Sequence, residues 1–413
     1  MSKAHIQCVE CQTTYPLWEL RYACDCGGLL EVAHEPLPSL RTVAEQRLSS
    51  RQAWDRSGVW RFREAILPLD PQELVTHPEG RTGFYEVAEL RRWTGSEGLY
   101  LKHEGENPTG SFKDRGMTAA VSGARKLGMK LLACASTGNT SSSLAAYAAR
   151  AGLQSVVLLP SGKVSVGKMA QTLGYGAHAL AIQGDFDDAM QSVRELAEAG
   201  RVYMVNSLNP FRIEGQKSII WDLLQDMNWQ APDWILVPGG NLGNTSAFGK
   251  AIQEAYSWGW IAKKPRIATI QAAGANPFFR SYERGFAVLE AMDAETIATA
   301  IRIGNPVNFP RAVKAIRGTG GLVAQVDDVA IMEAKAKIDR SGVGCEPASA
   351  ATLAGLKQLL AAGHIRPDET VVAVLTGHML KDSDAILKSQ TLSCVEVQAT
   401  TAAISQALDA LSR

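Results

Sequence analysis

The chain has 413 residues, of which 46% are hydrophobic, and it carries 42 basic and 42 acidic residues. This length can bury more than one core, so we expect two domains plus an appendage. The charges are balanced and interspersed, which gives no electrostatic footprint for nucleic acid or an anionic membrane. No apolar stretch is long enough for a signal peptide or a membrane span. We therefore expect a cytoplasmic protein with a small-molecule partner.

Four of the seven cysteines lie near the start of the chain, as a Cys8/Cys11 pair and a Cys24/Cys26 pair. Four thiolates can close a tetrahedral zinc site, which would stabilise a ribbon of short strands that has almost no core. The second pair is separated by one residue instead of two, so a metal-free ribbon stays open as the alternative. Both interpretations make residues 1–35 a structural, zinc-ribbon-like segment. The other cysteines lie among apolar or small residues, and we expect no disulfides.

The next segment, residues 36 to about 80, contains five prolines among charged residues. It is expected to be an extended connector with one or two short helices. From about Leu99 onward, strands, Gly-rich turns and amphipathic helices alternate. The first strands are LLACAS, SVVLLP, AHALAI and VYMVNS, and a second series is DWILVPGG, RIATIQAAG and TVVAVLTGH. This alternation predicts right-handed βαβ units in two parallel α/β layers, with the ligand in the cleft between them.

The most informative motif is GENPTGSFKDRG at residues 105–116. It predicts that Lys113 lies in the first turn of a helix, with Ser111 as its N-terminal cap. Because cations are disfavoured at helix N-termini, this position should lower the proton affinity of the lysine and favour a neutral amine that can condense with an aldehyde. A solvated surface lysine is the alternative, and the flanking sequence argues against it.

A second motif, STGNT, lies where a strand delivers the chain to a helix N-terminus. Its amides and the hydroxyls of Ser136, Thr137 and Thr140 could hold a substrate carboxylate, and the Asn139 amide could donate to a cofactor oxygen. A capped turn rich in Ser and Thr would look the same. On its own this motif leaves the two readings equally open.

A third motif, GGNLGN, also lies between a strand and a helix, and its glycines allow several backbone amides to converge on one phosphate. It is neither a Walker loop nor a dinucleotide fingerprint, so ATP and NAD lose support. The candidate phosphate ligands are Gly240, Asn241, Leu242, Gly243 and Asn244.

Two weaker stretches are VNSLNPFRIEGQKS, with Ser207, Arg212 and Lys217, and VLTGHMLKD, with Thr376 at the end of an apolar strand. Alone, the first could be a surface cluster of charges and the second a turn. Because both stretches occur in a fixed order with the other motifs, they favour a shared functional site.

Together these motifs resemble the fold type II pyridoxal-phosphate enzymes, and among them the threonine synthases, from about Leu99 to Asp382. The stretches AIRIGNP and GCEPASAA and the cysteine-bearing start are similar to the same group. The resemblance implies that Lys113 carries the cofactor as a Schiff base, that Asn139 meets its phenolic oxygen and that residues 240–244 hold its phosphate. It further places Thr376 near the pyridine nitrogen and Ser207 with Arg212 on the substrate phosphate.

The implied protein is a cytoplasmic homodimer that converts O-phosphohomoserine and water into threonine and phosphate with pyridoxal 5'-phosphate as its cofactor. Structural zinc in the ribbon and a metal-free ribbon stay open as alternatives. The implied fold has two parallel-sheet, three-layer α/β domains of the tryptophan synthase β type. The large cofactor-binding domain would comprise 36–116 and 209–390, the small domain 117–208, and the tail 391–413.

Two departures from the resemblance stand out. This chain reads GRTGFYEV from Gly80 where such enzymes commonly read GNTPL, which leaves that turn and its substrate contacts open. It also lacks a long N-terminal extension, so we expect no activation by S-adenosylmethionine. The alternatives are another lyase of the class, such as threonine dehydratase or a phosphoserine-using cysteate synthase, and a catalytically idle cofactor-binding protein. Ser207 and Arg212 argue against the dehydratase, whose substrate has no phosphate.

Overall fold

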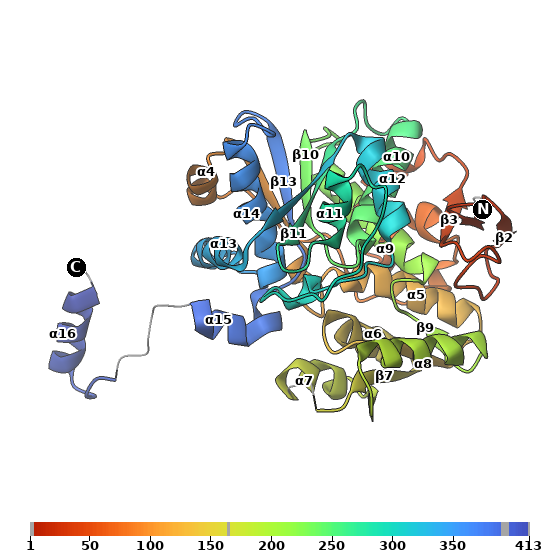
Figure 1. Cartoon of the computed structure of the whole chain (residues 1–413), viewed down its shortest axis with the longest axis horizontal. Helices are drawn as coiled ribbons and strands as arrows, with labels where there is room; N and C mark the ends of the chain where they lie inside the picture. The colour runs from red at the N-terminus through yellow and green to blue at the C-terminus, as the bar shows by residue number, and fades with distance from the viewer. Residues whose placement is uncertain (1–3, 163–165, 390–395, 412–413) are drawn as a thin grey trace.

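A computed structural model describes residues 4–162, 166–389 and 396–411. Within these residues the strands form three sheets (Figure 1). The N-terminal sheet is antiparallel, in the order β2-β1-β3, and its strands are β1 Ala4–Cys8, β2 Thr14–Pro16 and β3 Leu30–His34. We call this sheet and its connecting loops the ribbon.

The largest sheet has six strands in the order β12-β11-β10-β13-β5-β4, all parallel except the edge strand β4. Alternate residues of its central strands enter two different hydrophobic clusters, because successive side chains of a strand point to opposite faces. Helices cover both faces, which is why these strands are apolar throughout. The strands are β4 Phe84–Tyr85, β5 Gly98–His103, β10 Trp234–Pro238, β11 Arg266–Ala272, β12 Leu322–Val326 and β13 Thr370–Leu375.

The third sheet has four parallel strands in the order β8-β7-β6-β9. Its two faces also feed separate clusters, one toward α5 and α6 and the other toward α8. Its strands are β6 Leu131–Ala135, β7 Gln154–Pro160, β8 His178–Ile182 and β9 Tyr203–Met204. The predicted α/β fold with parallel sheets is therefore confirmed, and β12 is a strand that the sequence analysis did not identify.

The α-helices and 3-10 helices (η) connect and cover these sheets. They are α1 Leu40–Arg47, α2 Ala53–Arg56, η1 Trp60–Phe62, α3 Arg63–Ile66, η2 Pro71–Glu73, α4 Ala88–Thr94, η3 Glu104–Glu106, α5 Lys113–Lys126, α6 Asn139–Ala151, α7 Val166–Gly174, α8 Phe186–Glu198, α9 Pro210–Asp226, α10 Gly243–Ser257, α11 Pro277–Glu283, η4 Thr299–Ile301, α12 Phe309–Thr319, α13 Asp328–Arg340, α14 Pro347–Ala361, η5 Met379–Asp382, α15 Ser383–Ser389 and α16 Thr401–Leu411.

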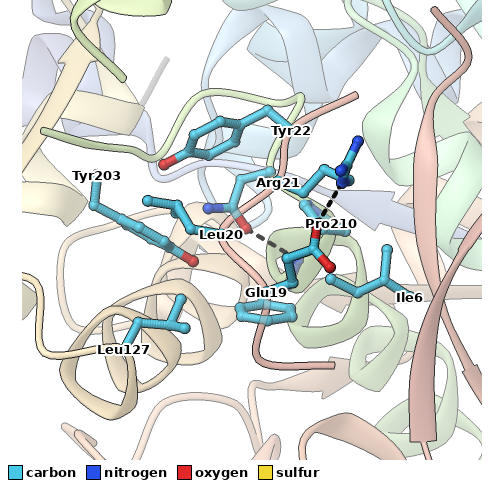
Figure 2. A pocket seen from close by; sticks show the side chains of 10 residues that line it. Ile6, Glu19, Leu20, Arg21, Tyr22, Leu127, Tyr203 and Pro210 are labelled. Carbon is cyan, nitrogen blue, oxygen red and sulfur yellow. Dashed lines mark hydrogen bonds and ion pairs between the residues drawn. The ribbon is translucent and has the colours of Figure 1, made fainter. Parts of the chain in front are cut away.

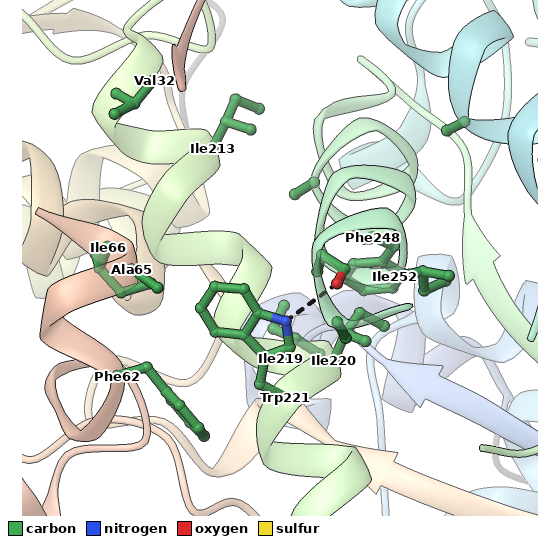
Figure 3. Packing of buried hydrophobic residues seen from close by; sticks show 14 of the residues in the cluster. Val32, Phe62, Ala65, Ile66, Ile213, Ile219, Ile220, Trp221, Phe248 and Ile252 are labelled. Carbon is green, nitrogen blue, oxygen red and sulfur yellow. Dashed lines mark hydrogen bonds between the residues drawn. The ribbon is translucent and has the colours of Figure 1, made fainter. Parts of the chain in front are cut away.

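The segment 36–80 differs from the extended connector that we expected. It contains three α-helices and two 3-10 helices, and it supplies core residues. Figure 3 shows Trp221 of α9 between Phe62 and Ile66 of this segment and Phe248 of α10. The Trp221 indole donates a hydrogen bond to the Ala251 carbonyl at 3.1 Å. The prolines punctuate the segment, but its aromatic residues fold it onto the large sheet.

The ribbon contacts the four-stranded sheet and helix α9. Its Tyr22 accepts a hydrogen bond from the Met204 amide of β9 at 2.9 Å, and its ring lies 6.1 Å from that of Tyr203 (Figure 2). On the other side, His34 bonds Glu214 of α9 at 2.8 Å. In Figure 1 the ribbon lies at one end of the molecule and α16 stands apart at the other. None of the described helices is long and apolar enough to cross a membrane.

Candidate active site

Lys113 is the first residue of α5, as the sequence predicts. The expected cap is wrong, however: Phe112 occupies the cap position without a side-chain bond, and the buried Ser111 hydroxyl has no partner among the described residues. The Ser111 main chain instead forms a β-bridge with Gly377. The lysine loop is therefore held by backbone pairing to the segment that follows β13.

The Lys113 amine lies in a partly buried position beside one cation and one carboxyl group. Burial and, after it, repulsion by Arg212 lower its pKa to about 7, and Glu346 opposes the shift. The sequence analysis attributed a lowered proton affinity to the helix N-terminus, whereas burial and Arg212 are the causes in the structure. Near neutral pH a substantial fraction of this amine is consequently neutral and nucleophilic.

The loop before Lys113 is fixed to its surroundings on both sides. The Phe112 amide donates to the Thr376 carbonyl at 3.0 Å, which joins the first and last predicted motifs directly. Asp114 accepts bonds from the Thr109 amide and hydroxyl at 2.7 and 2.6 Å and from the Ser143 hydroxyl of α6 at 2.6 Å. These bonds hold the start of α5 against α6, the helix into which the STGNT loop leads.

Asn139 and Thr376, which the sequence places in separate motifs, meet at a third residue, Glu346. Asn139 Nδ2 donates to Glu346 Oε2 at 3.0 Å, and the Thr376 hydroxyl lies 3.4 Å from Glu346 Oε1 and 3.1 Å from the Ser349 hydroxyl. Glu346 is 4% exposed, and burial raises its pKa. Sequence reasoning noted GCEPASAA but did not identify this glutamate. Glu346 precedes a proline at the start of α14, so in the sequence it looks like an ordinary helix cap. In the structure its side chain makes no capping bond.

Ser136, Thr137 and Thr140 lie at the start of α6. The cap residue of this helix is Gly138, which has no side chain to bond the helix amides. All three residues are partly exposed. The Ser136 hydroxyl accepts a bond from the Gly138 amide at 3.3 Å, so the loop folds back on itself. The arrangement leaves helix N-terminal amides and short hydroxyls together, which suits an anion.

The GGNLGN loop leads into α10 through Leu242, which adopts φ of 61° and gives no side-chain cap to the helix. A Cβ added to Gly240 would lie 2.9 Å from Ile301 Cα, so only glycine lets the two backbones approach this closely. The buried Asn244 Oδ1 has no partner among the described residues. A bound phosphate would fit this loop for three reasons: the start of α10 is uncapped, the glycine backbone is closely packed, and Asn244 Oδ1 has no partner among the described residues.

Arg212 lies in the first turn of α9 and is 2% exposed. Its Nη1 donates to the Val205 carbonyl at 2.9 Å, its Nε has no partner, and no described carboxylate lies within ion-pair distance. Burial lowers its pKa to about 10. A buried cation without a counter-ion is costly, and it implies an anion that the protein itself does not supply.

Ser207 connects this arginine segment to the GGNLGN loop, because Asn241 Nδ2 donates to the Ser207 hydroxyl at 2.7 Å. The predicted substrate-phosphate ligands and the predicted cofactor-phosphate ligands are therefore neighbours. Lys217, from the same stretch, points elsewhere: it is buried among Glu214 and Glu254 at 2.5 and 2.7 Å. It has a structural role.

A lysine that sequence reasoning missed closes the site at its outer side. Lys381, in η5, donates to the Thr109 carbonyl at 3.1 Å, to the Ser142 hydroxyl of α6 at 3.1 Å and to Gln171 of α7 at 2.8 Å. It thereby ties the end of the large sheet to two helices of the four-stranded sheet. In the sequence it follows GHML, where a lysine is ordinarily a solvated surface residue.

The four ribbon cysteines form one cluster, in which all sulfur atoms lie within 4.8 Å of one another. The Cys8–Cys26 and Cys11–Cys24 sulfur distances are 3.6 and 3.5 Å. A tetrahedral zinc site with bonds of about 2.3 Å has sulfur atoms about 3.8 Å apart, so the cluster could hold the metal despite its tight second pair. The six cysteines among the described residues are free thiols, and Cys394 lies outside those residues.

Comparison with known proteins agrees with this geometry. Residues 75–377 match the family of pyridoxal-phosphate dependent enzymes. The chain is 46% identical to a threonine synthase of Methanocaldococcus jannaschii over 93% of this chain and 94% of that protein, and 44% identical to one of Methanosarcina acetivorans over 93% of each. The structure of Escherichia coli threonine synthase superposes with a TM-score of 0.72 at 16% identity, covering 98% of this chain and all of that one, which supports the fold. The chain therefore belongs to the pyridoxal-phosphate-dependent enzymes and, within them, to the threonine synthase family.

Proposed function

We propose that this chain converts O-phosphohomoserine and water into threonine and phosphate at the site around Lys113. The observation that carries this proposal is the proximity of Lys113, with its pKa lowered to about 7, to the buried Arg212, which has no counter-ion among the described residues. The first can exchange protons and bond covalently with an aldehyde near neutral pH. The second can bind the phosphate of a substrate, which a dehydratase acting on threonine would not need.

Pyridoxal phosphate, when bound, supplies an electron sink that labilises protons on the carbons of an attached amino acid. We assign its phosphate to residues 240–244, its ring oxygen to Asn139, its pyridine nitrogen to Thr376 and its aldehyde carbon to Lys113. The unpartnered Asn244 oxygen, the uncapped start of α10 and the lowered pKa of Lys113 support this placement. A hydroxyl such as that of Thr376, rather than a carboxylate, at the pyridine nitrogen gives a milder sink.

In this proposal the Lys113 amine moves the protons. Its Nζ removes the α proton of the substrate and then a β proton, and it returns a proton at the γ carbon once phosphate has left. Water then adds across the α and β carbons, its hydroxyl to the β carbon and a proton to the α carbon. Arg212 and Ser207 bind the departing phosphate, and the hydroxyls of Ser136, Thr137 and Thr140 orient the substrate carboxylate. We add Glu346 as a positioning residue, because it holds Asn139 and Thr376 at once and raises the proton affinity of Lys113.

We further propose that the ribbon cysteines bind a structural zinc ion, that the protein is a cytoplasmic homodimer and that the two larger sheets form the two domains predicted from the sequence. The sulfur distances support the first of these proposals. A zinc site closed by four protein ligands has no open position, so its role is to hold the ribbon together.

The test is phosphate or ammonia release measured side by side with O-phosphohomoserine, phosphoserine, threonine and serine. We expect phosphate and threonine from phosphohomoserine and no comparable turnover of the others. Preferred turnover of phosphoserine would identify a cysteate-synthase-like enzyme, and ammonia from threonine would identify a dehydratase. A Lys113→Ala protein that retained full turnover would exclude the assigned site.

A further inference from the structure

A cavity lies between strand β3 of the ribbon and the helices α9, α10 and α12. It has a volume of about 370 Å³ and opens to the surface. Cavities of this size accommodate small metabolites. None of the residues that the proposed reaction uses lines this cavity.

The charges around the cavity are unequal, since four basic and two acidic residues line it. They are Lys250, Lys264, Arg311 and Lys314, with Glu31 and Glu254. Glu254 is already paired with Lys250 at 2.5 Å, and Glu31 lies 3.7 Å from Lys314. Among the described residues, Lys264 contacts neutral groups: Gln253 at 2.7 Å, the Gly318 carbonyl at 3.5 Å and the Tyr256 ring at 5.1 Å from its centroid. The cavity is therefore electropositive.

Arg311 is the buried member of this set, at 5% exposure. Its Nη1 donates to Asn308 at 2.6 Å and its Nη2 to the Leu30 carbonyl of the ribbon, while its Nε has no partner among the described residues. No described carboxylate lies within ion-pair distance of it. Burial lowers its pKa to about 10, and the more distant carboxylates of Glu31 and Glu214 oppose that shift. A buried cation with one unused donor, in a cavity with two further cations, is built to receive an anion.

We propose that this cavity binds a small organic anion that carries a carboxylate or phosphate group and that its occupancy regulates the proposed reaction. The anion would contact Arg311, Lys264 and Lys314, which all line the cavity. The route to the active site is short: Asn308, which holds Arg311, also donates from Nδ2 to the Asn241 carbonyl at 3.1 Å. Asn241 belongs to the GGNLGN loop, so this regulatory step rests on the proposed cofactor placement, whereas the binding step does not.

The binding step is tested by calorimetric titration of the cofactor-loaded protein with succinate and with inorganic phosphate, which separate the two anion chemistries. We expect at least one probe to bind saturably and Lys264→Gln to weaken it about tenfold or more, as loss of a charge-assisted bond requires. Lys263→Gln is the matched control, because Lys263 is adjacent in sequence but exposed and paired with Asp233 at 2.7 Å. Arg212→Gln should leave this binding intact.

Two results would contradict the binding site. The first is that neither probe binds saturably at millimolar concentration. The second is that only Arg212→Gln abolishes binding, because the anion would then lie in the active site. The regulatory step is tested with the probe that binds. We expect this probe to change the absorption spectrum of the bound cofactor in the wild type and in Lys263→Gln. In Lys264→Gln, the same spectral change should need about tenfold more probe. Saturable binding without any spectral change would refute regulation while leaving the site.

Discussion

Asn139 donates a hydrogen bond to Glu346 at 3.0 Å, although 207 residues separate the two in the chain. The bond joins the start of α6 to the start of α14. Because Glu346 is the carboxyl group that opposes the lowering of the Lys113 pKa, this pair sets both the geometry and the charge of the site.

The first prediction concerns the pH at which Lys113 reacts. Its pKa is lowered to about 7 from 10.5, so the nucleophilic neutral amine forms as pH rises through about 7. We expect cofactor-free protein to recombine with pyridoxal phosphate faster as pH rises, with the midpoint of the increase near pH 7. Absorbance of the cofactor band measures it, and a midpoint near that of an ordinary lysine would show that the amine is not perturbed.

The second prediction is that the two charged neighbours move this midpoint in opposite directions. Arg212→Gln removes a repulsive cation and should raise the midpoint, whereas Glu346→Gln removes an attractive carboxyl group and should lower it. Glutamine at 346 keeps an acceptor for Asn139, which limits structural damage. Equal midpoints in the wild type and both variants would mean that burial alone sets the pKa.

These residues show which parts of the site the sequence could predict. Lys113, Asn139 and the GGNLGN loop lie in local motifs where a strand meets a helix, so their neighbourhood is visible in the sequence. Glu346 and Lys381 act through partners that lie hundreds of residues away, and only the assembled sheets bring them to the site. No local pattern distinguishes them from a helix cap and a surface lysine.

The same limit applies to the fold. Alternation of strands and helices predicted the parallel sheets, because each element is apolar over its own length. The sequence predicted only one or two short helices in 36–80, since the stability of this segment comes from packing of Trp60 and Phe62 against α5 and α9 rather than from local pattern. This packing forms only in the folded protein, whereas the prolines in the sequence indicate an irregular segment.

The third prediction concerns the close contact of α5 and α9, the helices that carry Lys113 and Arg212. A Cβ at Gly215 would lie 1.9 Å from the Arg115 carbonyl oxygen, a backbone atom that cannot move away alone. Gly215→Ala should therefore destabilise the protein by about 3 kcal/mol or more. The control, Gly318→Ala in α12, meets no atom within 4 Å and should stabilise by about 0.5–1 kcal/mol. Urea unfolding measures both, and equal stability of the two variants would contradict the close packing.

The fourth prediction concerns the ribbon. We expect about one zinc ion per chain by metal analysis, reduced strongly in Cys26→Ser and unchanged in Cys134→Ala, whose cysteine is buried far from the cluster in the four-stranded sheet. Because the cysteines lie outside the active site, chelation should loosen the ribbon before it affects turnover. Loss of turnover in a protein that stays folded after chelation would contradict the structural role, and a metal-free preparation with an ordered ribbon would favour the alternative that the CxC spacing leaves open.

The last prediction concerns substrate specificity and depends on Arg212. This side chain is buried without a carboxylate partner among the described residues, and it lies close enough to Lys113 to lower the pKa of that amine. A γ-phosphate dianion on the substrate would supply the missing counter-ion, and a guanidinium can bind two of its oxygens while staying charged. Arg212→Ala should consequently weaken apparent affinity for phosphohomoserine by about 1.5–3 kcal/mol, or one to two decades, with a larger loss in turnover if the contact tightens as phosphate departs.

Cofactor binding supplies the internal control, because the cofactor phosphate is assigned to residues 240–244 and should stay bound in Arg212→Ala. Arg366→Ala, at an exposed arginine paired with Asp368, controls for general loss of positive charge and should behave as the wild type. The measurements are the KM for phosphohomoserine and the inhibition constant of inorganic phosphate, at equal ionic strength. If both constants were unchanged in Arg212→Ala, the buried arginine would not contact the substrate. The phosphate of the substrate would then need another partner, and the preference for phosphohomoserine over unphosphorylated amino acids would lose its structural basis.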